Sequence, residues 1–314
     1  MLANKKRTFK LILFGGLGNQ LFQYFAGQYV ANKHGANLKI DSTFSQFGRS
    51  GHSDWIGATT IPGNITMSAP RYSFRYLDSL FKRRTRELLA RLVKEKKLQL
   101  KILRQYHSPA PGYDPQLEQL KPSVTIVGYF QTWRYFDALK NKGLVPELQM
   151  KQPSRWFLEM TEQMNNQGRV LGIHVRRGDY VGNSGIGTLS RAYYDVAADE
   201  LRSRGVTWDA VWIFSDEISL IQNEFKEFSK SKDMMFFMEP PDESHSFESM
   251  LLLSRCSSLI IANSTFSWWA ATLGNQEKIV VSPSKWFADM EDPRDLYPPA
   301  WIQATSSWDD LNRT

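Results

Sequence analysis

Hydrophobic and polar residues follow one another along the chain with the two periods that distinguish strands from helices. Near the start, the apolar run 10–14 predicts a buried strand, residues 15–20 a glycine-rich turn, and the apolar spacing in 21–33 a helix. A second strand is expected at 38–41. A strand, a helix and a strand in this order are typical of a doubly wound α/β unit.

The same alternation resumes in the second half of the chain. Residues 141–154, with two prolines and a glycine, predict a linker before it. The pattern therefore predicts two α/β domains, residues 1–150 and 151–314. In the second domain we expect strands at 170–175, 211–215, 234–238 and 259–262 and helices at 189–204, 246–255 and 266–273.

Between these halves the periodicity is weaker. Residues 42–70 predict a surface loop, and residues 71–106 predict a basic helix with twelve Lys or Arg against three Asp or Glu. That excess is larger than the net charge of +7 of the whole chain. Two interpretations fit a basic amphipathic helix: it binds an anionic membrane surface, or it is a solvated helix that packs on the protein by one face. No nucleic-acid motif accompanies the charge, so no nucleic-acid partner is expected.

The composition is that of a globular protein in a reducing compartment. Among 314 residues Cys256 is the single cysteine, which excludes an intrachain disulfide. The apolar run Leu11 to Phe14 is too short for a signal-peptide core, and no stretch reaches the ~18–20 apolar residues of a membrane span. We therefore expect a cytoplasmic protein, at most peripheral on the inner membrane surface.

Two features leave other functions open. Gly16-x-Gly18 with Asp41 at the end of the second strand resembles part of a dinucleotide fingerprint, but Leu21 replaces its third glycine, so a nicotinamide-dependent oxidoreductase is one alternative. The aromatic cluster 131–136 follows the strand expected at 124–130. Its rings suit either a core or a sugar-binding wall, and a non-catalytic carbohydrate-binding protein is the second alternative.

The strand at 170–175 ends in Arg176, Arg177 and, after a glycine, Asp179. Arginine offers a planar fork of donors for phosphate oxygens, although two surface arginines paired with carboxylates would give the same pattern. The strand at 211–215 ends in Asp216. Open parallel sheets bind ligands at these strand ends, which predicts a phosphate site there.

A second phosphate-binding element is expected where the strand at 259–262 passes into a helix. Asn263, Ser264 and Thr265 stand at that junction, where the first helical amides are unpaired and carry partial positive charge. Hydroxyl residues there cap the helix or bind a diphosphate. The five histidines are scattered and no Asp-x-Asp pair occurs, which favours phosphate chemistry without a metal.

Four motifs in order resemble those of the α1,2-fucosyltransferase family. They are Gly15 to Gln23, His174-Val175-Arg176-Arg177-Gly178-Asp179, Phe214-Ser215-Asp216, and Asn263-Ser264-Thr265-Phe266-Ser267-Trp268-Trp269. The resemblance implies a GT-B fold of two Rossmann-like domains, the N-terminal one on the acceptor side and the C-terminal one binding GDP-fucose. It also implies inverting transfer of L-fucose to the 2-hydroxyl of a terminal galactoside, such as lactose, N-acetyllactosamine or a lipid-linked O-antigen, without a metal or other cofactor.

The resemblance implies roles for individual residues. Arg177 would bind the β-phosphate, helped by Arg176, and Asn19 would face the reacting centre from the N-terminal domain. The substrate-binding residues would be His174, Arg176, Asp216, Glu248, Asn263, Ser264, Thr265 and Phe266.

Two assignments stay open at this stage. Asp179 is the first candidate for the base and His174 the second, but Asp179 could equally be a structural partner of an arginine. Relatives carry an aspartate before the apolar run of the helix at 246–255. Here Ser249 takes that position, so Glu248 is expected to read guanine in its place.

Overall fold

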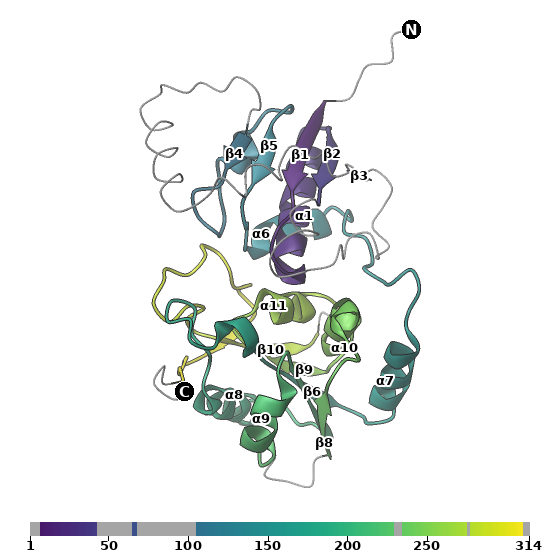
Figure 1. The fold of residues 1–314 in the computed structure, drawn as a ribbon, viewed down its shortest axis with the longest axis vertical. Coiled ribbons are helices and arrows are strands. Elements are labelled where there is room, and N and C mark those ends of the chain that lie inside the picture. Colours follow the sequence, from purple (N-terminus) through teal and green to yellow (C-terminus); the bar gives the residue numbers. More distant parts are fainter. Residues whose placement is uncertain (1–6, 43–64, 68–104, 229–233, 275–276, 310–314) are drawn as a thin grey trace.

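Two parallel β-sheets, one from each half of the chain, form the framework of the protein (Figure 1). The computed structural model describes residues 7–42, 65–67, 105–228, 234–274 and 277–309. The N-terminal sheet has the order β3 (Ile65–Met67), β2 (Asn37–Asp41), β1 (Thr8–Ile12), β5 (Thr125–Val127) and β4 (Gln105–His107). The C-terminal sheet has the order β11 (Ile302–Ala304), β10 (Ile279–Pro283), β9 (Ser258–Ile260), β6 (Val170–Val175), β7 (Ala210–Ser215) and β8 (Met234–Met238).

Helices cover both sheets, and two of them, α1 and α11, face each other between the two sheets (Figure 1). The N-terminal half contributes α1 (Leu17–Lys33) and α6 (Trp133–Lys140), and short 3₁₀ turns lie at η2 (Leu117–Gln119), η3 (Gly178–Tyr180) and η4 (Glu243–His245). The later helices are α7 (Arg155–Asn165), α8 (Arg191–Ser203), α9 (Ile218–Phe225), α10 (Ser246–Ser254) and α11 (Thr265–Thr272).

The predicted doubly wound pattern is confirmed, with four corrections in the N-terminal half. The strand expected at 124–130 is the shorter β5, which ends at Val127. The first helix begins at Leu17, inside the predicted glycine-rich turn. The predicted loop 42–70 contains strand β3, and the last two residues of the predicted helix 71–106 belong to strand β4. In both cases pairing with a neighbouring strand decides the local structure. The rest of the basic segment, 71–104, lies outside the described residues, so its predicted helix and membrane contact stay predictions.

Strand β6 lies in the middle of the C-terminal sheet and is buried along its whole length, as expected for a strand covered on both faces. Its odd-numbered residues Leu171, Ile173 and Val175 pack in the hydrophobic cluster that also contains residues of α8 and α9. Its even-numbered residues face α10 and α11: a side chain at Gly172 would meet Leu253 and Cys256, and His174 stacks on a ring of α11. Alternate residues of β6 therefore contact different helices, α8 and α9 on one face of the sheet and α10 and α11 on the other.

Aromatic side chains join the two halves of the molecule. Phe22 and Phe25 of α1 pack on Trp268 and Trp269 of α11, with ring centroids 4.4 to 5.0 Å apart. The indole of Trp269 also donates a 2.9 Å hydrogen bond to the Gly18 carbonyl. One hydrophobic core therefore runs from the N-terminal sheet through α1 and α11 into the C-terminal half.

Lys278 holds the ends of two helices together. Its ammonium donates to the carbonyls of Ser254 (2.6 Å), Ala270 (3.1 Å) and Leu273, at the C-terminal ends of α10 and α11. Burial lowers the pKa of Lys278 to about 8, so the side chain remains charged at neutral pH. The cation satisfies carbonyls that lack helical partners and complements both helix dipoles.

Replacing Lys278 by methionine should lower the free energy of unfolding by about 2 kcal/mol, because buried carbonyls lose their donor. Urea denaturation followed by far-UV circular dichroism would measure the change. Lys285→Met, at an exposed lysine of the same half, is the matched control and should stay within about 0.5 kcal/mol of the original chain. Equal stability of the two variants would contradict the assigned role of Lys278.

Candidate active site

A cavity of about 680 Å³ lies between the two halves. Its N-terminal wall comes from the start of α1 and from the segments around Pro111 and Gln131, and its C-terminal wall from the end of β6, the start of α11 and residues 286–291. Six predicted site residues line it: Asn19, Arg176, Asp179, Ser264, Thr265 and Phe266. A second hollow, of about 710 Å³, lies against α7 and α10 and contains none of the predicted site residues.

Arg176 is the cation of this cavity, and two carboxylates orient it. Its guanidinium forms ion pairs with Asp216 (3.1 Å) and Asp179 (2.5 Å), and it lies over the ring of Tyr180. Burial alone would lower the pKa of Arg176, but Asp216, Tyr180 and Asp179 outweigh it and the pKa is raised. The Arg176 Nε atom is buried without a partner. A charged guanidinium is therefore fixed in direction at the cavity wall.

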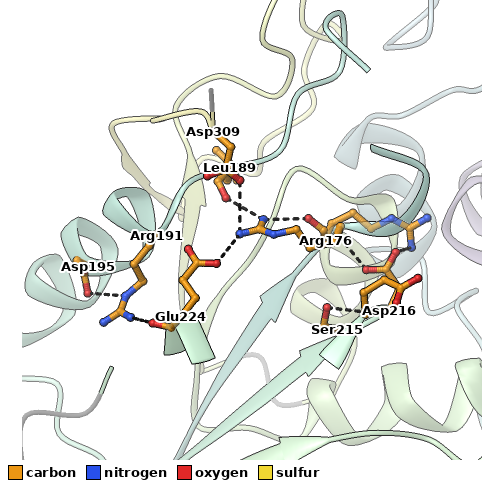
Figure 2. A network of polar contacts seen from close by, with 10 residues as sticks. Arg176, Leu189, Arg191, Asp195, Ser215, Asp216, Glu224 and Asp309 are labelled. Atoms are coloured by element: carbon orange, nitrogen blue, oxygen red, sulfur yellow. Dashed lines mark hydrogen bonds and ion pairs between the residues drawn. The ribbon is translucent and has the colours of Figure 1, made fainter. Parts of the chain in front are cut away.

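Arg177 lies elsewhere, which corrects its prediction as the diphosphate ligand. Its side chain is 7% exposed and does not line the cavity. Its guanidinium donates to the carbonyl of Leu189 (3.0 Å) and forms ion pairs with Glu224 (3.2 Å) and Asp309 (3.5 Å). Figure 2 labels these three partners. The physical reason is the alternation along β6, which directs Arg177 to the face of α8 and α9 and Arg176 to the opposite face.

Asp216 and Asn263 support the cavity from behind it. One Asp216 oxygen accepts from the Arg177 amide at 2.9 Å while the other pairs with Arg176. The side-chain amide of Asn263, which is 1% exposed, donates to the carbonyls of Ile186 (3.3 Å) and Gly187 (3.1 Å). Neither residue lines the cavity, so the structure corrects their predicted donor contacts and gives them positioning roles instead.

The N-terminus of α11 forms the floor of the cavity. Ser264 is its N-cap residue, but its side chain makes no capping hydrogen bond, and both Ser264 and Thr265 line the cavity. The amides of the first turn lack helical partners and give this end a partial positive charge. The floor also meets the other half, because a side chain at Gly18 would overlap the backbone of Thr265. Hydroxyls, amides and Arg176 are thus gathered at one cavity, an arrangement that suits an anion.

His174 lies beneath the cavity wall. Its ring stacks on Phe266 with centroids 5.0 Å apart, and only Phe266 lines the cavity. Burial, with a smaller contribution from Arg176, lowers the pKa of His174 to about 3. The imidazole is therefore neutral at physiological pH and supports Phe266, which corrects its prediction as a ligand-facing base.

Glu248 is also corrected, because it is 2% exposed and lies outside the cavity. Its two carboxylate oxygens accept from the amide (2.6 Å) and the hydroxyl (2.5 Å) of Ser154, the N-cap residue of α7. The neighbouring Ser249 is buried and does not line the cavity either. Glu248 thus attaches α10 to the start of α7.

Asn19 lines the cavity, together with a partner that sequence reasoning missed. The side-chain amide of Gln131 donates to the Asn19 side-chain oxygen at 2.8 Å, and both residues line the cavity. Gln131 comes from the predicted aromatic cluster, in which Tyr135 and Phe136 are core residues and Trp133 packs against the core. The rings of that cluster therefore pack in or against the core, and Gln131 is its one residue that lines this cavity.

Further cavity residues carry no motif that sequence reasoning could have used. Tyr180 follows Asp179 by one position, and burial raises the pKa of its hydroxyl to about 12, so the hydroxyl remains a proton donor. Residues 286–291 lie far along the chain and reach the cavity only through the tertiary fold. The residues missed on this side are Tyr180, Ile186, Ser246, Trp286, Phe287, Met290 and Glu291.

The structure does not support Asp41 as a nucleotide ligand, on which the oxidoreductase alternative depends. Asp41 forms a 2.7 Å ion pair with Lys10 and does not line the cavity.

Within the described residues, no three His, Cys, Asp or Glu side chains gather as a metal-ligand group, and metal independence stays a prediction. In the same part of the chain, no helix is both long and apolar enough to span a bilayer.

Two parallel α/β sheets facing across a cavity define the class of the protein as a GT-B glycosyltransferase fold. Solved fucosyltransferases share this fold at low sequence identity. Bradyrhizobium NodZ aligns with a TM-score of 0.50 and 15% identity, over 85% of this chain and 92% of NodZ. A FUT1 variant from Arabidopsis thaliana in complex with GDP aligns with a TM-score of 0.53 and 14% identity, over 91% of this chain and 73% of FUT1.

The model of Glycosyl transferase family 11 matches residues 127–305, and the chain belongs to that family. It is 28% identical over 311 residues to an Escherichia coli alpha-1,2-colitosyltransferase, covering 93% of this chain and 97% of the relative. It is 27% identical over 310 residues to the E. coli O-antigen biosynthesis glycosyltransferase WbnK, covering 88% and 94%. Mouse Galactoside 2-alpha-L-fucosyltransferase Sec1 is 24% identical over 192 residues, covering 57% of this chain and 51% of that protein. The predicted family resemblance is confirmed.

Proposed function

We propose that the protein transfers L-fucose from GDP-fucose to the 2-hydroxyl of a terminal galactoside, with inversion and without a metal. The observation that carries the proposal is the shared cavity of Arg176 and the α11 N-terminus, with Ser264 and Thr265 beside them. The names of the relatives add support, since they include fucosyl and colitosyl transferases that form α1,2 linkages. The O-antigen relative favours a lipid-linked O-antigen as acceptor.

The chemistry of the reaction fits this arrangement. As the bond between fucose and the β-phosphate breaks, positive charge develops on the sugar ring and negative charge on the departing GDP. Arg176 and the amides of α11 stabilise that negative charge with donors that are already oriented, which is often the largest contribution to catalysis. In this proposal, the Arg176 cation and the partial positive charge of the α11 amides stabilise the diphosphate, as a divalent metal ion does in other diphosphate sites.

The N-terminal wall would bind the acceptor. Asn19, Tyr129 and Gln131 line the cavity from the N-terminal half and offer amide and aromatic groups to a sugar. We also propose that the protein is cytoplasmic and that the basic segment 71–106 contacts an anionic membrane. A lipid-linked acceptor would be found at such a surface.

The decisive experiment is turnover of GDP-fucose with lactose in the presence of EDTA. We expect release of GDP and a lactose product fucosylated at the 2-hydroxyl of galactose, as identified by NMR. GDP-colitose is the competing donor, and a clear preference for it would replace fucose in the proposal.

Other outcomes would contradict the proposal at separate points. Turnover that requires Mn²⁺ or Mg²⁺ would remove metal independence. Galactoside binding without transfer from either donor, across a panel of galactosides, would favour a carbohydrate-binding protein. NADH binding in a fluorescence titration would favour the oxidoreductase alternative.

A further inference from the structure

Among the described residues, two carboxylates line the cavity: Asp179 and Glu291. Transfer to a hydroxyl needs a group that accepts the hydroxyl proton as the new bond forms. The two carboxylates differ in what already binds them, and this difference decides between them.

Asp179 is already engaged by the cation of the site. Its oxygen lies 2.5 Å from the Arg176 guanidinium, which the proposed function needs for the diphosphate. Protonation of Asp179 would weaken this ion pair at the moment when Arg176 must hold the departing GDP. His174 is excluded as a base because it lies beneath Phe266 and burial lowers its pKa to about 3.

Glu291 is an exposed residue at the cavity and, within the described part of the chain, makes no hydrogen bond or ion pair. Its carboxylate oxygens therefore have no protein partner to give up when they accept a proton. Phe287 and Met290 of the same segment also line the cavity and offer apolar contact to a sugar face.

The backbone that carries Glu291 is held in place. The carboxylate of Asp292, the next residue, accepts from the amides of Trp286 (2.9 Å) and Phe287 (3.0 Å). The amides of Ala288 and Asp289 donate to the carbonyls of Ile186 and Gly185, each at 3.1 Å. The segment 286–292 is thus a fixed support for a side chain that is itself unbound, as a positioned base requires.

We propose that Glu291 is the general base of the transfer reaction, an inference that rests on the proposed function. Glu291 takes the proton from the 2-hydroxyl of the galactoside while that oxygen forms a bond to C1 of fucose. The bond from C1 to the β-phosphate oxygen breaks on the opposite side, and its electron pair leaves with GDP. Arg176 and the α11 amides receive that charge, so proton acceptor and leaving-group ligand are separate residues.

The test compares Glu291→Gln with Asp289→Asn. Asp289 is an exposed carboxylate of the same segment that does not line this cavity, so it is the matched control. We expect Glu291→Gln to lower kcat by about 10²-fold or more, the typical contribution of a general base, with an unchanged Kd for GDP. The acidic limb of its pH–rate profile should disappear. Asp289→Asn should keep both the rate and the limb.

Asp179→Asn separates the two carboxylates, because it should lower turnover through Arg176 yet keep the acidic limb. Loss of that limb in Asp179→Asn, or a Glu291→Gln variant with the original rate and pH profile, would overturn the assignment of Glu291 alone. An original chain that binds GDP but transfers no fucose would overturn the proposed function, and this inference with it.

Discussion

Replacing Arg176 by methionine should lower kcat/KM for GDP-fucose by about 10³-fold, at the upper end of the loss seen when one oriented donor is removed. The guanidinium lines the cavity and is held by Asp216 and Asp179, and in the proposed function it supplies both charge and a planar fork of donors to the diphosphate. Initial rates of GDP release and a calorimetric titration with GDP would measure the loss. Because Asp216 keeps its bond from the Arg177 amide, the variant should remain folded.

Arg176→Lys is the informative companion variant. Lysine keeps the charge but cannot form bidentate hydrogen bonds. We therefore expect kcat/KM for GDP-fucose to fall by about 10-fold to 10²-fold, less than in the methionine variant. A methionine variant that retains GDP affinity and turnover would show that Arg176 is not the diphosphate ligand.

The same substitution one residue later should have a different effect. Arg177→Met should lower the free energy of unfolding by about 3 kcal/mol, because it leaves Glu224, Asp309 and the Leu189 carbonyl without their shared cation. Urea denaturation would give the free energy, and the GDP titration should show nearly unchanged affinity for the folded fraction.

A double variant tests the cause. Adding Glu224→Gln to Arg177→Met removes the unpaired charge on α9, so the two substitutions together should destabilise less than the sum of the single effects. A stable Arg177→Met protein that no longer binds GDP would restore the sequence-based assignment of Arg177 to the phosphate.

The exchange of roles between these arginines could have been read from the sequence. Ile173 and Val175 are apolar and predict the face of β6 that is packed by helices, and Arg177 continues that face two residues on. His174 and Arg176 belong to the other face. The family resemblance marked both arginines without distinguishing them, whereas the strand period does distinguish them.

Other parts of the site could not be predicted from local pattern. Glu248 follows the expected helix register, but its carboxylate bonds Ser154, which precedes it by 94 positions. Glu291 stands in a segment without periodicity, and only the tertiary fold brings it to the cavity that Arg176 also lines. Long-range contacts of this kind leave no trace in a single sequence, while the strands and helices that carry the motifs do.

The aromatic junction between α1 and α11 has a consequence for how substrates enter. Separating the two halves would bring Phe22, Phe25, Trp268 and Trp269 into water, and inter-domain motion is expected mainly where such an interface is small and polar. The Gly18 carbonyl would also lose its indole donor. The aromatic junction therefore opposes separation of the two halves, and we expect the two walls of the cavity to keep their spacing when ligands bind.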